Sequence, residues 1–190
     1  KGDKVQNKRL SDIGGKGLFT KKIENELLNK KIDIAVHALK DIPSKENKNL
    51  FTNCFLKRND ARDVLITRKK QKFKNLPKNS IVGTSSFRRE FQLKKIRKDL
   101  IYKLIRGNVD TRISKLKNKI YDAIILSYAG LKSLKMENNI SQVFSFSEII
   151  PSAGQGTIAL QCRKNDIRMV QLLKAINHIP TNICVNIERD

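Results

Sequence analysis

The sequence contains no tryptophan, and aromatic residues make up only 6% of it. No apolar run is long enough to cross a bilayer, and no apolar segment follows the charged start Lys1-Gly2-Asp3-Lys4 as it would in a signal peptide. The scarcity of aromatic side chains leaves no stacking platform for nucleic-acid bases, and no helix-turn-helix pattern is present. These absences argue against a membrane protein and against a dedicated nucleic-acid binder.

Cysteine is also scarce, with Cys54, Cys162 and Cys184 isolated from one another in the sequence. None belongs to a CxxC pair, and His37 and His178 stand at no metal-ligand spacing from them. We therefore expect no metal site, a reducing compartment, and three thiols that behave as small buried apolar groups.

Acidic residues are few: 18 Asp and Glu against 40 Lys and Arg give a formal net charge of +22. A charge of this size ordinarily indicates an anionic partner such as nucleic acid. The lysines, however, are scattered along the chain, as the codon bias of an A/T-rich genome would scatter them. We interpret most of them as solvated faces and attach more weight to the fewer, clustered arginines.

The 190 residues suffice for one large domain or two small ones. The chain opens without methionine, so we expect a fragment truncated at both ends. Apolar patterns alternate between strand and helix along it, beginning with a helix that has Phe19, Ile23 and Leu27 on one face. Polar segments at 57–63 and 71–79 interrupt this alternation, and we interpret the first as a domain crossing and the second as linker-like.

Residues 32–43 are the segment around which the chain is organised. One face of the segment consists of alternating apolar residues: Ile32, Ile34, Val36 and Ala38. Because Ala35 and Leu39 make much of the other face apolar too, the pattern predicts a strand buried in a parallel or mixed sheet. It runs into Lys40-Asp41, and open α/β sheets bind ligands at the carboxyl ends of strands. The simpler interpretation is a solvated Lys-Asp pair in a turn.

A second strand-to-helix junction lies at Gly83-Thr84-Ser85-Ser86-Phe87-Arg88-Arg89. Ser85 or Ser86 is a natural N-cap, and the free N–H groups of a helix start suit a carboxylate or phosphate. Arg88 and Arg89 in the first turn oppose the helix dipole, which an anionic ligand would explain. The alternative is a solvated arginine pair.

A third junction, Arg106-Gly107-Asn108, precedes a helix with Val109, Ile113 and Leu116 on one face and Arg112 on another. Two successive junctions thus present arginines, whose planar guanidinium groups bind both oxygens of a carboxylate. Their clustering favours a ligand with several carboxylates.

The C-terminal part contains a small-residue turn, Pro151-Ser152-Ala153-Gly154-Gln155-Gly156, and then a strand near 157–162. The pattern after it predicts a helix with Met169, Leu172, Leu173 and Ile176 in register. Pro180 suits the first turn of a last helix.

Six segments in this order resemble the porphobilinogen deaminase (hydroxymethylbilane synthase) family, and the resemblance covers the whole chain. The segments are Gly14-Gly15-Lys16-Gly17-Leu18-Phe19, 33–43, 83–89, Arg106-Gly107-Asn108-Val109 with Thr111-Arg112, Tyr121-Asp122-Ala123-Ile124-Ile125-Leu126, and Gly154-Gln155-Gly156.

The resemblance implies an α/β fold of two periplasmic-binding-protein-like lobes with mixed sheets, an inter-lobe cleft and a third small α/β domain. The first lobe would comprise residues 1–56 with 157–175, the second 62–150, and residues 179–190 would begin the third. It implies a cytoplasmic, monomeric transferase that binds neither nucleic acid nor membrane.

The implied enzyme acts in porphyrin and haem biosynthesis. It joins four porphobilinogen molecules with loss of ammonia to give hydroxymethylbilane. The growing chain is held on a dipyrromethane cofactor, bound to a cysteine beyond Asp190. None of Cys54, Cys162 and Cys184 lies in that cysteine's motif, so the fragment by itself should be inactive.

By resemblance, Asp41 is the catalytic aspartate. Loss of ammonia leaves an electron-poor azafulvene, and a carboxylate near pyrrole N–H groups stabilises positive charge and assists proton transfer. The resemblance implies that the remaining matching residues bind the carboxylates of the substrate and the cofactor. These residues are Lys16, Lys40, Thr84, Ser85, Ser86, Arg88, Arg89, Arg106, Arg112 and Gln155.

Two positions depart from the family pattern, with Ala38 where many members have serine and Ser133 where others have arginine. The second departure puts one substrate-carboxylate contact in doubt. A non-catalytic two-lobe anion-binding protein remains the alternative, and a basic nucleic-acid binder ranks last.

Overall fold

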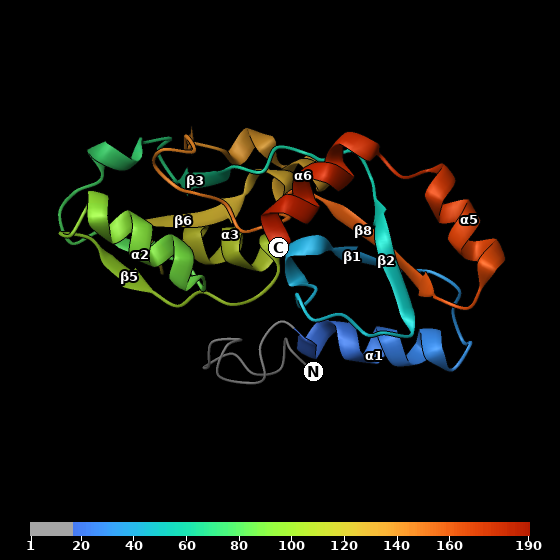
Figure 1. Cartoon of the computed structure of the whole chain (residues 1–190). Helices are drawn as coiled ribbons and strands as arrows, with labels where there is room; N and C mark the ends of the chain where they lie inside the picture. The colour runs from blue at the N-terminus through green and yellow to red at the C-terminus, as the bar shows by residue number, and fades with distance from the viewer. Residues whose placement is uncertain (1–16) are drawn as a thin grey trace. The chain divides into compact units, whose positions relative to one another are not determined.

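The computed structural model of the chain describes residues 17–190, with side chains from Thr20 onward (Figure 1). Within this range the chain forms two compact units. The continuous unit is Asp60–Ser152, and the discontinuous unit combines residues 17–59 with Ala153–Asp190. The predicted bounds of the two lobes remain predictions, as does the assignment of residues 179–190 to a third domain. In the structure these last residues belong to the discontinuous unit.

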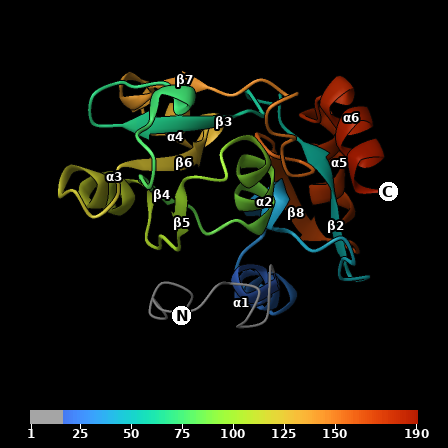
Figure 2. The same cartoon turned by 90° about the vertical axis from the view of Figure 1, so that its left-hand side faces the viewer.

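The continuous unit is built on a five-stranded sheet in the order β5-β4-β6-β3-β7, which Figure 2 shows from β7 at the top to β5 at the bottom. Strand β4 is parallel to both of its neighbours, β5 and β6, whereas β3 is antiparallel to β6 and β7. The strands and helices of this unit are β3 Asp63–Thr67, β4 Ile81–Gly83, α2 Phe87–Ile96, β5 Ile101–Lys103, α3 Val109–Lys117, β6 Ala123–Ser127, α4 Tyr128–Ser133 and β7 Gln142–Val143, with short 3₁₀ turns η4 Phe73–Asn75 and η5 Glu137–Asn139.

Helices cover both faces of this sheet, because side chains along each strand alternate between two apolar clusters. Leu65 and Ile125 pack with Leu93 of α2 on one face. Ile124 packs on the other face with the buried residues of α3, among them Ile113. The mixed α/β class and the predicted face of the 109–117 helix are therefore confirmed.

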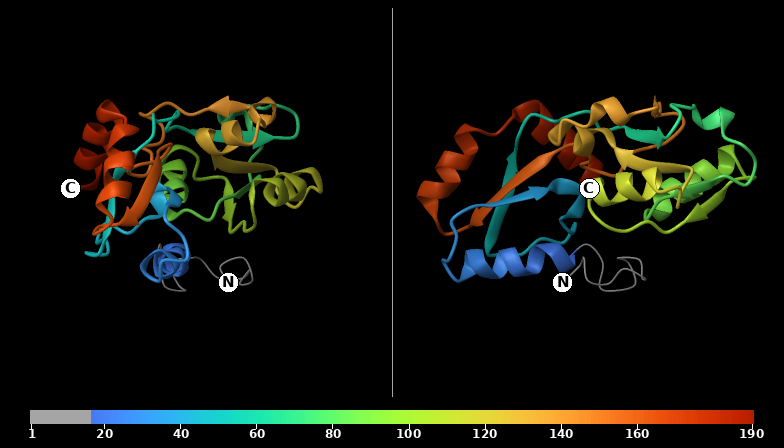
Figure 3. Two further views of the ribbon diagram at one scale, coloured as in Figure 1. Left: turned by 90° about the vertical axis from the view of Figure 1, so that its right-hand side faces the viewer. Right: turned by 180° about the vertical axis from the view of Figure 1, so that it is seen from behind.

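The discontinuous unit contains a three-stranded antiparallel sheet, β1-β8-β2, seen from behind in the right panel of Figure 3. Its central strand comes from the C-terminal part of the chain. The elements of this unit are α1 Gly17–Leu28, β1 Ala35–Ala38, the 3₁₀ turn η3 Leu39–Asp41, β2 Leu50–Phe55, β8 Ile158–Arg163, α5 Ile167–Ala175 and α6 Ile179–Arg189. Pro180 lies in the first turn of α6, as predicted.

The prediction for β1 was wrong in its face and its sheet type. Strand β1 is four residues long and lies at the edge of an antiparallel sheet. Ala35 and His37 are buried, whereas Val36 is 62% exposed and Ile34 is 40% exposed. The buried face includes the His37 imidazole because Gln161 on β8 gives it a polar partner, with Nε2 and Oε1 3.3 Å apart. Gln161 in turn donates to Thr52 Oγ1 of β2 at 3.1 Å.

Three smaller predictions also fail. Residues 71–79 are not a linker, because Phe73 and Leu76 are core residues of the continuous unit. Leu172 and Ile176 on and after α5 are more than half exposed, although Leu173 is buried. Cys54 and Cys162 are buried as expected, but Cys184 on α6 is exposed. Among the described residues, no helix has the length and hydropathy needed to cross a membrane.

Candidate functional site

The predicted site residues fall into two groups, one in each unit, and Lys16 lies outside the described residues. The discontinuous unit holds Lys40, Asp41 and Gln155. The continuous unit holds Thr84, Ser85, Ser86, Arg88, Arg89, Arg106 and Arg112. No group of three His, Cys, Asp or Glu side chains that could hold a metal ion occurs among residues 17–190.

The hydroxyl residues of the continuous unit lie at the carboxyl end of β4. Thr84 is fully buried, and its Oγ1 accepts a hydrogen bond from Ser86 N at 3.2 Å. Ser86 caps α2 by accepting from Arg89 N, so the structure selects Ser86 of the two candidate caps. Strand β4 stands between two parallel neighbours, the position at which open α/β sheets bind ligands.

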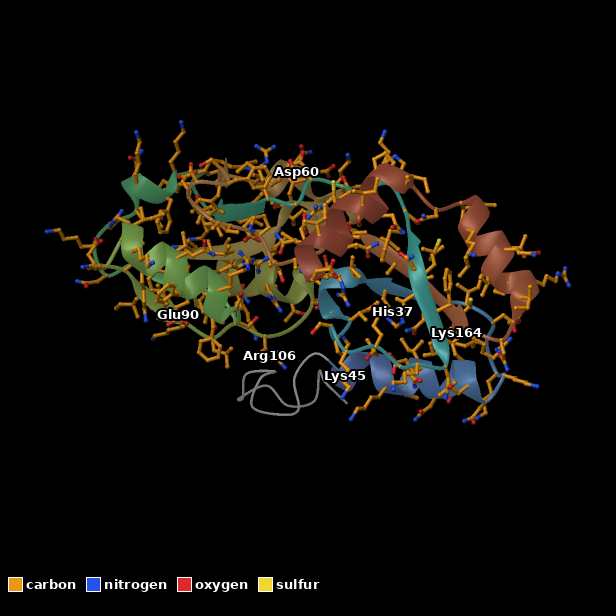
Figure 4. The ribbon with its side chains drawn as sticks, viewed as in Figure 1. His37, Lys45, Asp60, Glu90, Arg106 and Lys164 are labelled. Carbon is orange, nitrogen blue, oxygen red and sulfur yellow. The ribbon has the colours of Figure 1, made fainter. Side chains whose placement is uncertain are left out.

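The neighbouring strand β5 leads into the second group of polar residues. Arg106, labelled in Figure 4, is only 8% exposed, and its carbonyl accepts from Lys115 Nζ at 3.1 Å. Asn108 caps α3 by accepting from Thr111 N. The Arg112 guanidinium folds back onto the loop and donates from Nε to Gly107 O at 2.7 Å. Gly107 has φ +110°, a conformation that side chains other than glycine rarely adopt.

Arg88 and Arg89 are bound to a carboxylate of their own unit. The buried Asp63 side chain lies 2.7 Å from Arg88 Nη2 through Oδ2 and accepts from Arg89 Nε and Nη2 through Oδ1. Arg89 also donates to Ile125 O. Burial lowers the pKa of Arg88 from its ordinary value, and Asp63 opposes this shift.

Neither of the two sequence interpretations anticipated Asp63. An internal anion offsets one of the two charges that oppose the α2 dipole, so the arginines are not a solvated pair and a ligand is not the only explanation for them. The sequence signal for Asp63 was available, because an acid that opens the buried run Val64-Leu65-Ile66 needs a cationic partner.

Asp41 lies on the η3 turn, directly after β1. Its side chain is exposed, whereas Leu39 and Ile42 on either side of Lys40-Asp41 are 0% and 1% exposed. Leu39 N donates to Thr157 O, and Ile42 N closes the turn on Leu39 O, both at 3.0 Å. The turn therefore presents a carboxylate at the surface from a backbone that is anchored on both sides in the core.

Gln155 lies in the tight turn that precedes β8. It is 1% exposed, and its carbonyl accepts from Arg58 Nε at 3.0 Å. Arg58 forms a two-point ion pair with Glu188 of α6, and Glu188 also accepts from Gly154 N at 2.8 Å. Burial acts to raise the pKa of Glu188, but hydrogen bonds from Arg58 and Gly154 outweigh it, so the pKa lies below its ordinary value.

The two departures from the family pattern lie at exposed positions. Ala38 is exposed at the end of β1, and Ser133 at the end of α4 donates to Ala129 O at 2.9 Å. The serine hydroxyl is therefore used within its own helix.

The comparison with known families agrees with the resemblance. Residues 1–171 match the family model for "Porphobilinogen deaminase, dipyromethane cofactor binding domain". The chain is 50% identical over 189 residues to the porphobilinogen deaminase of Rickettsia prowazekii strain Madrid E, and 48% identical to that of Rickettsia bellii strain OSU 85-389. It is 47% identical over 188 residues to the porphobilinogen deaminase of Buchnera aphidicola, strain APS.

These matches cover 99% of this chain but only 60–63% of each relative. The chain thus spans somewhat less than two thirds of the length of the relatives it matches.

Among solved structures, the chain resembles a putative methionine-binding lipoprotein from Bacillus subtilis, with a TM-score of 0.53 and 13% identity. The match covers 85% of this chain and 76% of that structure. At this identity the likeness concerns the fold alone.

Proposed function

Because the chain belongs to the porphobilinogen deaminase family, we propose that it forms part of a transferase that condenses four porphobilinogen molecules, with loss of ammonia, into hydroxymethylbilane. The observation that carries the proposal is the η3 turn. It exposes one carboxylate, Asp41, between two fully buried anchors at the end of a strand.

In this proposal Asp41 is the catalytic aspartate. When ammonia leaves porphobilinogen, positive charge develops on the pyrrole system, and a carboxylate within hydrogen-bond reach of the pyrrole N–H stabilises that charge. The carboxylate also accepts a proton as the new bond between pyrroles forms. A fixed backbone favours this role, because the acid needs no reorganisation as charge develops.

The continuous unit supplies groups suited to the acetate and propionate arms of the pyrroles. Thr84, Ser85 and Ser86 offer hydroxyls at the end of β4, and Arg106 and Arg112 follow β5. Arg88 and Arg89 contribute less positive charge than their number suggests, because Asp63 offsets one of them. Lys16, Lys40 and Gln155 complete the proposed binding set.

The family model is that of a domain that binds the dipyromethane cofactor, whose pyrrole rings carry the same carboxylate arms as the substrate. Arginine and hydroxyl donors fit such a group, and we assign its binding to the same residues of the continuous unit. When bound, the cofactor supplies the pyrrole position to which the growing chain is attached. Its covalent attachment is not assigned to Cys54, Cys162 or Cys184.

We also propose that the protein is a monomer, that it is located in the cytoplasm, and that it binds neither nucleic acid nor membrane. Light scattering would check the first point by giving the mass of one chain, 21.8 kDa. Titration with DNA at several salt concentrations would check that the protein does not bind nucleic acid. A nucleic-acid binder would lose affinity steeply as salt is added, because binding releases counterions.

The activity can be tested in a chimera in which these 190 residues replace the matching segment of the Rickettsia prowazekii enzyme. The chimera should consume porphobilinogen and release ammonia, and Asp41→Asn should abolish nearly all turnover while leaving the fold unchanged. Asp33→Asn is the matched control, because Asp33 precedes β1, is 68% exposed and pairs with Arg163. It should keep turnover within about threefold of the parent, since exposed pairs contribute roughly 0–1 kcal/mol.

Near-normal turnover of the Asp41→Asn chimera would remove the assigned role. Binding of porphobilinogen without any release of ammonia by the parent chimera would instead favour the non-catalytic anion-binding alternative.

A further inference from the structure

The C-terminal end of α6 lies beside the turn that carries Asp41 (Figure 1). The Arg189 guanidinium donates to three carbonyls in and directly after that turn, Leu39 O at 3.4 Å, Ile42 O at 3.3 Å and Pro43 O at 2.9 Å. A further hydrogen bond joins it to Glu46 at 3.1 Å. All of these residues belong to the discontinuous unit.

The three carbonyls bracket Asp41 on both sides. The 3₁₀ turn has a single internal hydrogen bond, from Ile42 N to Leu39 O, so the carbonyls of Ile42 and Pro43, which directly follow the turn, need partners from outside it. Water would satisfy them without fixing their positions. A guanidinium has five donors in one rigid plane, so it can bind several carbonyls at once and hold them in one geometry.

We propose that Arg189 is a positioning residue that fixes the Asp41 turn in the orientation needed for catalysis. The proposal rests on the proposed function, because it acts through the Asp41 carboxylate. Among the described residues, the Arg189 guanidinium bonds to backbone carbonyls in and after the turn and to the Glu46 side chain, and none of these is a proposed binding group.

The chain offers a matched control in the other unit. Arg97 binds the 3₁₀ turn η4 in the same manner, donating to Phe73 O, Lys74 O and Leu76 O at 2.9–3.1 Å and pairing with Asp99. None of the proposed site residues lies on η4. Arg97 therefore makes the same kind of contacts as Arg189, but the turn that it holds carries no proposed site residue.

The first test uses hydrogen exchange of the 190-residue chain. Arg189→Met should accelerate exchange of the Ile42 amide by about tenfold or more, because its acceptor Leu39 O loses the guanidinium that orders the turn. Exchange of the Leu76 amide, which donates to Phe73 O, should stay the same. Arg97→Met should give the opposite result. Unchanged protection of Ile42 in Arg189→Met would overturn the proposal.

The second test measures kinetics in the chimera, expressed per folded molecule. Arg189→Met should lower kcat by at least about tenfold and leave KM within about threefold, because a small displacement of a catalytic group slows chemistry without removing the carboxylate-binding residues. Arg97→Met should leave kcat within about threefold. Arg189→Lys should fold and recover part of kcat, since lysine keeps the charge but not the planar set of donors.

The two proposals fail in different ways. If Asp41→Asn keeps full turnover, the proposed role of Asp41 is wrong whatever Arg189 does. If Asp41→Asn is inactive but both Arg189 variants keep the kcat of the parent, only the positioning role is wrong. The same holds if Arg97→Met lowers kcat as much as Arg189→Met does, because the effect then reports general stability.

Discussion

The carboxylate of Asp63, which has no solvent exposure, accepts two hydrogen bonds from the Arg89 guanidinium, at 3.0 Å from Nε and 2.7 Å from Nη2. This pair joins the first residue of β3 to the first turn of α2. It therefore fixes the helix start next to Ser85 and Ser86, where the proposed ligand carboxylates bind. The electrostatics of the site depend on this internal acid as much as on the arginines.

Replacing Asp63 by Asn should destabilise the continuous unit strongly. The variant leaves the buried Arg89 without its carboxylate, and breaking a buried ion pair from one side costs about 3–5 kcal/mol. Urea unfolding followed by circular dichroism measures the loss. Asp60→Asn is the control, because Asp60 pairs with the partly exposed Arg62, and it should cost less than about 1 kcal/mol. Equal costs for the two variants would contradict the buried pair.

Gly154→Ala should destabilise the discontinuous unit by at least about 2 kcal/mol. Gly154 has φ +69°, and an added Cβ would lie 2.7 Å from Leu39 Cγ, beneath the Asp41 turn. Gly130→Ala provides the comparison. Gly130 lies in α4, where an added Cβ would meet Ser127 Oγ at 3.0 Å, and the helical preference of alanine offsets this crowding. Its unfolding free energy should change by less than about 1 kcal/mol, measured by the same urea titration.

The three thiols should differ sharply in reactivity. Cys184 is exposed on α6, whereas Cys54 and Cys162 are buried and burial raises the pKa of both thiols. Because the thiolate is the reactive form, iodoacetamide should label the folded chain once and the urea-unfolded chain three times, as counted by mass spectrometry. Cys184→Ser should abolish labelling of the folded chain. Rapid labelling of that variant would show that a second thiol is accessible.

Glu188 should make stability depend on acid pH. Its pKa in the folded chain lies below the ordinary value of 4.5, so the unfolded chain binds more protons in this range. The stabilisation is present above about pH 4.5 and is lost as the pH falls through the lowered pKa.

Comparison of the parent with Glu188→Gln by urea unfolding isolates this contribution. The difference in unfolding free energy should be constant from about pH 7 to pH 5 and should shrink as the solution is acidified further. A difference that does not change with pH would mean that the contact is not an ionised one.

Much of the fold follows from local patterns in the sequence. Apart from residues 71–79, the continuous unit was predicted well, because its central strands are largely apolar and Ser86 caps α2 at one of the two expected positions. The discontinuous unit was predicted less well, because the sheet that contains β1 depends on a strand more than a hundred residues away. No pattern within 32–43 reveals that Gln161 will provide a hydrogen-bond partner for the His37 side chain on the buried face.

The site divides in the same way. The sequence identifies Asp41, Arg106 and Arg112 as candidates through their positions after strands. It does not reveal that Asp63 binds Arg88 and Arg89 or that Arg189 holds the Asp41 turn, because Asp63 and Arg189 come from distant segments. Arg189 lies 148 positions after Asp41 in the chain, and only the folded unit brings α6 to the turn.

The row of polar groups His37, Gln161 and Thr52 has a consequence for how the chain is made. It joins all three strands of one sheet, and its middle member is translated last. A ribosome must therefore deliver more than a hundred further residues before β1 and β2 can receive the strand between them, and Asp60–Ser152 can acquire its own core during that delay. Until then β1 and β2 lack the strand that separates them, and their unpaired backbone groups are open to pairing with other chains.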